Sequence, residues 1–425
     1  MATQHTTQAW ASVSAFTEVL FGRLPRADQR RWADAYMRGL LTTPGKKTVR
    51  RLAATVSDSS TAPQALHQFV NASPWEWEPV RAELARWVGR RTRPRALVIG
   101  PVVLPKRGDR SCGVHRRFVP QAGRTVNCQV GIGAFLSTDS EVVPVDWRLL
   151  LPEEWSQDPQ QRRRARIPDT VRPGRADSAA AQALDMAEES GRRRDLAGLP
   201  VVVDLTGYAD ADEVVRGLMS TGRNFVVAVP DSFPLVPAAP DRQLPGGTDG
   251  AVAAQRFLAL HCSRRPRKEE VGTHGVARTP AGEEGAGVPG GIRGAGARQV
   301  TVLTGLVRLP GTRPLLRVFA EWDPAACRTG QVWLADLAHR PVADLLGLAG
   351  LHAATTDTLE RLESDFGLRA FEGRSYPGWH RHMTLVSAAF AYSSLSRDPC
   401  PVPAASPRPT PRPAPRRTPT RTACN

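Results

Sequence analysis

The stretch RALVIGPVVLPKRGDRSCGV, residues 95–114, decides how the rest of the chain is interpreted. Its apolar run, residues 96–99, is short and unbroken, which is typical of a buried strand. Gly100 follows the run, and a basic turn begins at Lys106. In many nucleic-acid enzymes a metal-binding carboxylate stands at the end of such a strand, whereas here the run ends on glycine. Either this strand has lost an acid or it never carried one.

The chain is long and basic. It has 425 residues, a formal net charge of +16 and 41% hydrophobic residues. This composition is sufficient for a packed core in two domains, or in one large domain with an insertion. The positive charge favours a polyanionic partner such as DNA, through phosphate contacts and counterion release. Arginine-rich coding in a GC-biased host would produce the same charge, so both explanations stay open.

The cysteine and hydropathy patterns exclude several classes of protein. The six cysteines include no CxxC pair and no Cys/His spacing typical of zinc sites, which argues against a disulfide framework and favours a reducing cytosol. The first residues lack the basic start and apolar centre of a signal peptide. No apolar run approaches the ~20 residues that a membrane span needs. We therefore expect a cytoplasmic protein without a membrane partner.

Residues 1–92 are predicted to form an N-terminal helical domain that could bind DNA. Apolar residues recur at helical spacing from residue 10 to residue 92. Basic residues stand near the start of one predicted helix, where side chains and backbone donors could meet a phosphate: Lys46, Lys47, Arg50 and Arg51. A solvated helix face is the plainer interpretation of the same charges.

Residues 93–396 show a different pattern. From residue 95 onward, apolar or alternating runs separated by Gly, Pro and Asp predict three or four strands. Helices and strands then alternate, which favours an α/β fold with a mixed sheet. Within this domain, residues 231–299 are rich in Gly, Pro, Arg and Glu and predict a flexible insertion. The Pro- and Arg-rich residues 397–425 predict a disordered tail.

Four stretches, taken in order, carry a family resemblance: RTVNCQVGIGAF (124–135), LLLPEEW (149–155), NFVVAVP (224–230) and FGLRAFEGRSYPGWHRHMTLVSAAFAY (366–392). Together they resemble the insertion-sequence transposases of the DDE superfamily endonuclease type. The similarity covers roughly residues 10–395. It implies an RNase H-like mixed sheet flanked by helices, DNA cleavage and strand transfer, and a homodimer or larger assembly. It also implies a place in the bacterial cytosol, associated with the nucleoid.

In that family, three carboxylates hold two Mg²⁺ ions that activate the attacking oxygen and stabilise the leaving oxygen of a phosphodiester. Counting from the matching motifs places the first acid at Gly100, the second at Leu205 and the third at Thr356. None of these residues carries a carboxylate. The resemblance therefore implies Mg²⁺ as cofactor but leaves its ligands missing.

Two neighbouring acids remain candidates for the catalytic role. Asp204 precedes Leu205, and would serve as catalytic acid and metal ligand if the strand ends in a bulge. Otherwise it is a turn or capping acid. Asp357 follows Thr356, but on a helix it is rotated by about 100° from it. Glu363 stands where the resemblance expects a phosphate-binding lysine.

The basic framework of the family is largely retained, and positioning contacts to phosphates need no metal. Besides the four basic residues of the N-terminal domain, the predicted DNA contacts are Lys106, Arg107, Arg116, Arg117, Arg124, Arg374, His380, Arg381 and His382. For the two histidines, a structural hydrogen-bonding pair near Trp379 is an alternative that stays open.

These observations predict a transposase-like DNA-binding protein of the DDE type with lost or impaired metal-dependent phosphodiester cleavage and strand transfer. An active transposase using the shifted acids Asp204 and Asp357 is one alternative. A co-opted DNA-binding regulator is another. An unrelated basic α/β protein would be indicated if residues 95–230 and 300–335 did not form a single mixed sheet.

Overall fold

The computed structural model describes residues 2–239, 250–262, 266–272 and 297–396. As the apolar spacing predicts, the N-terminal region is helical. Its helices are α1 Ala2–Phe21, α2 Ala27–Thr42, α3 Val49–Val56, α4 Ala62–Asn71 and α5 Glu78–Arg91. Thr48 caps α3, because its side chain accepts a hydrogen bond from the backbone N–H of Arg51.

A single large sheet forms the centre of the molecule. Its first strands are β1 Ala96–Pro105, β2 His115–Val119, β3 Arg124–Ser137, β4 Val142–Leu149, β5 Val201–Val203 and β6 Phe225–Val229. Its later strands are β7 Pro234–Pro237, β8 Val252–Ala253, β9 Arg267–Gly272, β10 Ala297–Arg308, β11 Leu316–Asp323, β12 Arg328–Thr329 and β13 Val332–Ala335.

The strand β1 lies at the heart of this sheet. It pairs antiparallel with β3 on one side and parallel with β5 on the other, and β5 pairs parallel with β6. β4 pairs with β3, so the order β4-β3-β1-β5-β6 combines antiparallel strands with parallel ones. The predicted mixed, RNase H-like α/β sheet is confirmed. Because β1–β6 and β10–β13 belong to one sheet, the condition for an unrelated fold is not met.

Helices cover the sheet and connect its strands. Between β4 and β6 the chain forms α6 Glu153–Ser156, α7 Pro159–Ala165, α8 Ala179–Gly191 and α9 Ala211–Thr221. The shorter elements are η1 Pro120–Ala122, α10 Ala254–Phe257 and the π-helical turn η2 Leu258–Cys262. The last two helices are α11 Val342–Phe366 and α12 Tyr376–Leu395.

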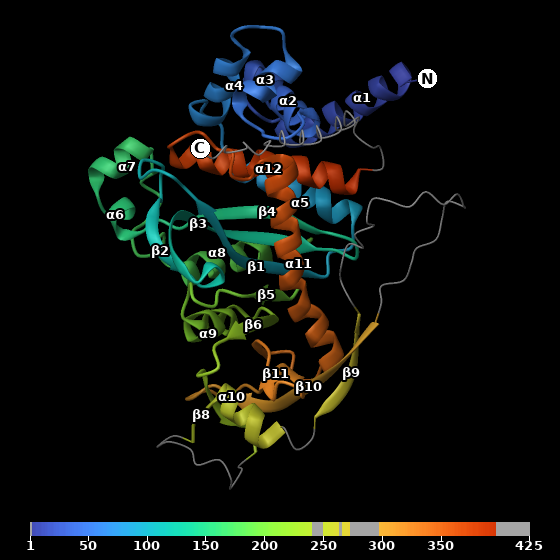
Figure 1. The fold of residues 1–425 in the computed structure, drawn as a ribbon, viewed down its shortest axis with the longest axis vertical. Coiled ribbons are helices and arrows are strands. Elements are labelled where there is room, and N and C mark those ends of the chain that lie inside the picture. The colour runs from blue at the N-terminus through green and yellow to red at the C-terminus, as the bar shows by residue number, and fades with distance from the viewer. Residues whose placement is uncertain (1, 240–249, 263–265, 273–296, 397–425) are drawn as a thin grey trace, which may run out of the picture.

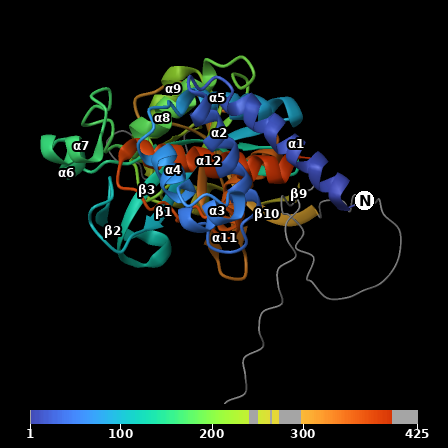
Figure 2. The ribbon, with the colours of Figure 1, turned by 90° about the horizontal axis from the view of Figure 1, so that it is seen from above.

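The last two helices join the parts of the molecule. α12 contacts β4 on one side and α2, α4 and α5 on the other, so it is enclosed between the sheet and the N-terminal helices (Figure 1). α11 contacts β1, β5 and β6 and extends to the later strands. Seen from above, the N-terminal helices lie over α12, and α6, α7 and β2 project to one side (Figure 2). No helix of the described residues is long and apolar enough to cross a membrane.

The predicted flexible insertion at residues 231–299 is wrong for most of its described part. β7 pairs with β10 and β8, and β9 pairs with β10. The physical reason is that this Gly- and Pro-rich segment contains apolar residues that the sheet buries, among them Leu235, Val252 and Phe257. Residues 240–249, 263–265 and 273–296, and the tail predicted at 397–425, lie outside the described residues.

Candidate functional site

Gly100 and Asp204 lie side by side on neighbouring parallel strands. Ile99 of β1 is in register with Val203 of β5, and the N–H of Asp204 donates to the carbonyl of Ile99 at 3.1 Å. The residues that follow, Gly100 and Asp204, therefore share one face of the sheet. A Cβ placed on Gly100 would lie 3.8 Å from the Asp204 carbonyl oxygen. The glycine thus stands where a β1 side chain would project toward Asp204.

The third member of this cluster is His352 of α11. Its Nδ1 lies 3.5 Å from Asp204 Oδ2, and its Nε2 would lie 3.4 Å from a Cβ at position 100. The other carboxylate oxygen of Asp204 accepts the backbone N–H of Thr206 at 3.0 Å. The side chains of Asp204 and His352 are 18% and 28% exposed, so solvent reaches both. We call Gly100, Asp204 and His352 the Asp204 site.

The sequence did not single out His352. The available signal was its position one helical turn before Thr356, where side chains four residues apart share a helix face. A lone histidine in an apolar helix carries little information by itself.

Leu205, the position expected for the second acid, does not share the face of Gly100, whereas Asp204 does. Leu205 is 4% exposed and lines an apolar pocket with Val203, Val214 and Val227, on the side of α9. Successive side chains of a strand point to opposite faces, so a count that is wrong by one residue selects the wrong face. Asp204 reaches the face of Gly100 without a bulge between β1 and β5.

The third expected position, Thr356, is exposed on α11 one turn beyond His352. Asp357 is exposed too, but it is rotated by about 100° from Thr356 and by about 140° from His352. The neighbouring Thr358 points inward, where its Oγ1 donates to the carbonyl of Val142 at 2.9 Å. The structure therefore brings Asp204 and His352 together and keeps Asp357 away from them.

The residues of this site do not fit Mg²⁺. Magnesium prefers near-octahedral oxygen coordination. Asp204 offers the one carboxylate, and both of its oxygens already face other groups. Within the described ranges, no three His, Cys, Asp or Glu side chains come together in a way that could hold a metal ion. The Mg²⁺ implied by the family resemblance therefore lacks ligands here.

Most of the predicted DNA contacts lie at the surface. The exposed ones are Lys46, Arg50, Arg51, Arg107, Arg116, Arg124 and Arg374, while Lys106 and Arg117 are partly buried. Two separate segments meet at the end of α11. The Lys47 Cβ would lie 2.7 Å from a Cβ on Gly367, which ends that helix. From the sheet side, Lys106 interacts electrostatically with Glu363 and Arg369, and burial lowers its pKa.

Four of the predicted DNA contacts are corrected by the structure: Lys47, His380, Arg381 and His382 are all buried. Lys47 Nζ donates to the carbonyl of Leu40 at 2.6 Å, and Arg381 Nε donates to that of Trp75 at 2.9 Å. His380 stacks on Trp77 with ring centroids 4.7 Å apart. These side chains belong to the core. Because α12 is enclosed on both sides, its charged residues must find hydrogen-bond partners inside the protein.

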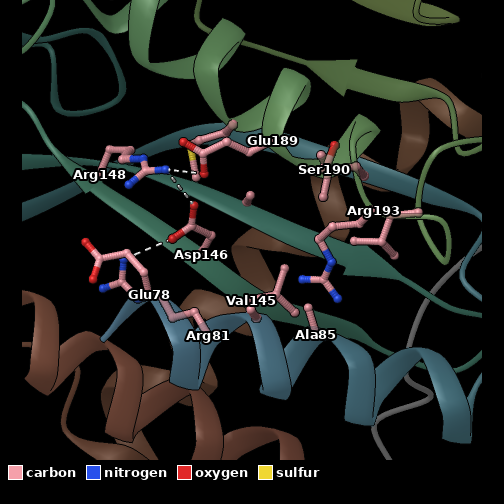
Figure 3. A pocket seen from close by; sticks show the side chains of 14 residues that line it. Glu78, Arg81, Ala85, Val145, Asp146, Arg148, Glu189, Ser190 and Arg193 are labelled. Carbon is pink, nitrogen blue, oxygen red and sulfur yellow. Dashed lines mark hydrogen bonds and ion pairs between the residues drawn. The ribbon is translucent and has the colours of Figure 1, made fainter. Parts of the chain in front are cut away.

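A second charged cluster lies on the opposite face of the sheet, between α5, β4 and α8 (Figure 3). It surrounds a cavity of about 120 Å³. Arg81 Nη1 lies 2.9 Å from Asp146 Oδ1, and Arg148 Nη2 lies 3.4 Å from Asp146 Oδ2 and 2.6 Å from Glu189 Oε2. Burial raises the pKa of Glu189. This chain of ion pairs ties helices from distant parts of the sequence to one strand.

Comparison with known proteins identifies one family. A family model described as DDE superfamily endonuclease matches residues 19–266, more than half of the chain. The match includes Gly100 and Asp204 and ends before α11, which carries His352. No curated protein matches the chain. The family resemblance seen in the sequence motifs is confirmed, and the chain belongs to the DDE superfamily endonuclease family.

Proposed function

We propose that this protein is a transposase-like DNA-binding protein that has lost metal-dependent phosphodiester cleavage and strand transfer. One observation carries the proposal: the imidazole of His352 lies over Gly100, 3.4 Å from where a Cβ would stand. Gly100 supplies no carboxylate, and a side chain at this position would contact the ring from its Cβ onward. Asp204 is then the sole acid of the Asp204 site.

One carboxylate does not supply the charge that a two-metal reaction needs. In such sites, two metal ions stand ~3.5–4 Å apart and share acidic ligands, which offset their mutual repulsion. Asp204 accepts the N–H of Thr206 and faces His352, so binding a metal would disrupt both interactions. Cleavage would also need a second acid on β1 or α11 at this place.

The alternative of an active enzyme with shifted acids requires Asp357 to turn toward Asp204. That movement is a rotation of α11 by about 140°, the angle between Asp357 and His352. It would withdraw Thr358 from its hydrogen bond to Val142 and expose residues that α11 now buries. We therefore favour binding without cleavage, which is compatible with a role as a co-opted regulator.

The proposed DNA contacts are basic residues about 20 Å from the Asp204 site along β1 and α11, and all of them are exposed except Lys106, which is partly buried. Lys106 and Arg107 follow β1, and Lys46 and Arg50 belong to the segment that packs on the end of α11. Positioning contacts of this kind go to phosphates and do not depend on a metal ion. Such binding would associate the protein with the bacterial nucleoid. A homodimer, which the family resemblance implies, stays a prediction that sedimentation would test.

The test combines DNA binding with DNA cleavage by the full chain. Fluorescence anisotropy should give the same affinity for a labelled duplex in Mg²⁺ and in EDTA at equal ionic strength. A supercoiled plasmid should stay intact in Mg²⁺ and in Mn²⁺. Nicking by the wild type that Asp204→Ala abolishes would contradict the proposal and establish an active enzyme. Failure of the wild type to bind any DNA at low salt would contradict the DNA-binding part of the proposal.

A further inference from the structure

Phe118 is an aromatic side chain without a packing role. It is 58% exposed, which is the largest value among the exposed large hydrophobic side chains of the described residues. It belongs to β2, which is an edge strand of the sheet. An exposed apolar side chain on an edge strand invites unwanted pairing with other chains. Phe118 is therefore accessible to a binding partner.

The strand pairing places Phe118 on the face of the sheet that carries the Asp204 site. Phe118 is opposite Thr125 of β3, and Gly100 is opposite Gly133 of the same strand. Positions 125 and 133 differ by an even number of residues, so their side chains lie on the same face. Phe118 and Gly100 thus share a face, but that face is covered between them, because Gln129 is fully buried and a Cβ on Gly131 would lie 3.2 Å from the Trp379 ring of α12.

One arginine accompanies Phe118 on its face of the hairpin. Arg116 precedes Phe118 by two residues and shares its face, whereas Arg124 pairs with Val119 and therefore lies on the opposite face. Both are exposed, and neither forms an ion pair with a carboxylate in the described part of the chain. An exposed aromatic ring beside an exposed guanidinium group matches a nucleotide, which presents a flat base and a negative phosphate.

The opposite face of the same hairpin is firmly attached. Arg117 Nη2 donates to the Gly207 carbonyl at 2.9 Å, and its guanidinium carbon lies 4.5 Å from the centre of the Tyr208 ring. The Tyr208 hydroxyl donates to Gln121 Oε1 at 3.1 Å. Gly207 and Tyr208 belong to the turn that follows Asp204. The hairpin is therefore fixed to the loop of the Asp204 site while Phe118 remains exposed.

We propose that Phe118 stacks on an unpaired base of bound DNA, at a junction between duplex and single strand, while Arg116 contacts the neighbouring phosphate. This inference rests on the proposed function, because it assumes that the protein binds DNA. An unpaired base is favoured over a base within the duplex for an energetic reason. Separating stacked base pairs costs a few kcal/mol per step, whereas a base that is already unpaired needs little or no such separation.

The experiment compares two DNA probes with the full-length protein. One probe is a blunt duplex, and the other is the same duplex with a short single-stranded extension whose first unpaired base is 2-aminopurine. Phe118→Ala should weaken binding of the extended probe by about five- to 150-fold, the effect of losing one base–aromatic stack. It should change the affinity for the blunt duplex by less than about twofold. Binding of the wild type should quench the fluorescence of 2-aminopurine, and Phe118→Ala should abolish this quenching. Phe118→Trp should preserve both affinity and quenching.

Leu315→Ala is the matched control, because Leu315 is another exposed apolar side chain, 37% exposed, and lies just before β11. It should change neither probe's affinity. If Phe118→Ala binds both probes in the wild-type ratio, the stacking inference is overturned and the proposed function stands. If the wild type binds no DNA, both fail. If sedimentation shows that Phe118→Ala removes self-association without a selective effect on the extended probe, a second copy covers the ring and the inference is wrong.

Discussion

The imidazole of His352 bridges two strands of the sheet: its Nδ1 lies 3.5 Å from Asp204 Oδ2, and its Nε2 would lie 3.4 Å from a Cβ on Gly100. The ring thereby links the position on β1 to α11. A Cβ at position 100 would be in van der Waals contact with the ring, so a longer side chain there would pack beside it. Substitutions at positions 100 and 352 are therefore expected to affect each other, because the two positions are in contact.

Restoring a metal site should consequently require both positions. We expect Gly100→Asp combined with His352→Glu to bind Mn²⁺ beside Asp204, because the double variant supplies three carboxylates and removes the ring. Metal at about 100 times its dissociation constant would stabilise the fold by roughly 2.7 kcal/mol. Thermal unfolding with and without Mn²⁺ measures this gain.

The matched control for that experiment is Gly100→Asn with His352→Gln, which has nearly the same side-chain shapes without the added charges. It should gain no stability from Mn²⁺, and neither should the wild type. Stabilisation of the wild type by Mn²⁺, abolished in Asp204→Asn, would show that the natural site binds metal and that our description of its chemistry is wrong.

Surface arginines should set the salt dependence of DNA binding. Replacing Arg107, Arg116 and Arg124 by glutamine removes three exposed charges of the proposed DNA surface. The slope of log K against log salt is negative, and removing one phosphate contact reduces its magnitude by about 0.9. The magnitude should therefore be smaller by up to about 2.7 in the triple variant. Fluorescence anisotropy over a series of salt concentrations measures the slope for a blunt duplex.

Arg192 and Arg216 serve as the control pair for the salt experiment. Each is exposed and forms an ion pair with an acid four residues earlier on its own helix, with Glu188 and Asp212 respectively. Their replacement by glutamine should leave the slope of the wild type unchanged. An equal decrease of the slope in both variants would mean that net charge, and not the proposed surface, controls binding.

The sequence predicted the sheet better than it predicted the site. Apolar runs such as residues 96–99 identify strands because burial of a strand depends on its own side chains. Motif counting selected Gly100 and Leu205, which lie on opposite faces of the sheet, because one residue along a strand reverses the face; Asp204 shares the face of Gly100. The interaction between Asp204 and His352 joins residues far apart in the chain, and no local pattern indicates it.

Helix α12 illustrates the other limit of the sequence. Its segment from His380 to His382 is charged and polar, which is typical of a solvated face, yet all three residues are buried. The reason is tertiary: the N-terminal helices cover the side of α12 that the sheet leaves open. The sequence of α12 alone indicates neither the sheet on one side of the helix nor the N-terminal helices on the other.

Arg81 should be essential for stability, because it joins α5 to β4 and α12. Its guanidinium donates to Asp146, to the Trp147 carbonyl at 2.7 Å and to the His380 carbonyl at 2.8 Å. Arg81→Leu leaves these buried acceptors without a partner, and removing one member of a buried pair costs roughly 3–5 kcal/mol. Urea unfolding measures the change. Arg90→Gln, at an exposed pair, should cost under about 1 kcal/mol, and equal losses would contradict this role of Arg81.

Buried neutral histidines should make the protein sensitive to acid. Burial lowers the pKa of His382 from its usual 6.5 to about 4. Between pH 6.5 and pH 4, His382 is therefore protonated in the unfolded chain but neutral in the folded one. Its contribution to the free energy of unfolding is fully present above pH 6.5 and decreases as the pH falls toward 4. The loss reaches about 3 kcal/mol from this residue. His382→Gln should flatten the dependence of unfolding free energy on pH in that window, whereas His339→Gln, at an exposed position, should not; identical profiles for all three proteins would exclude His382 as the source.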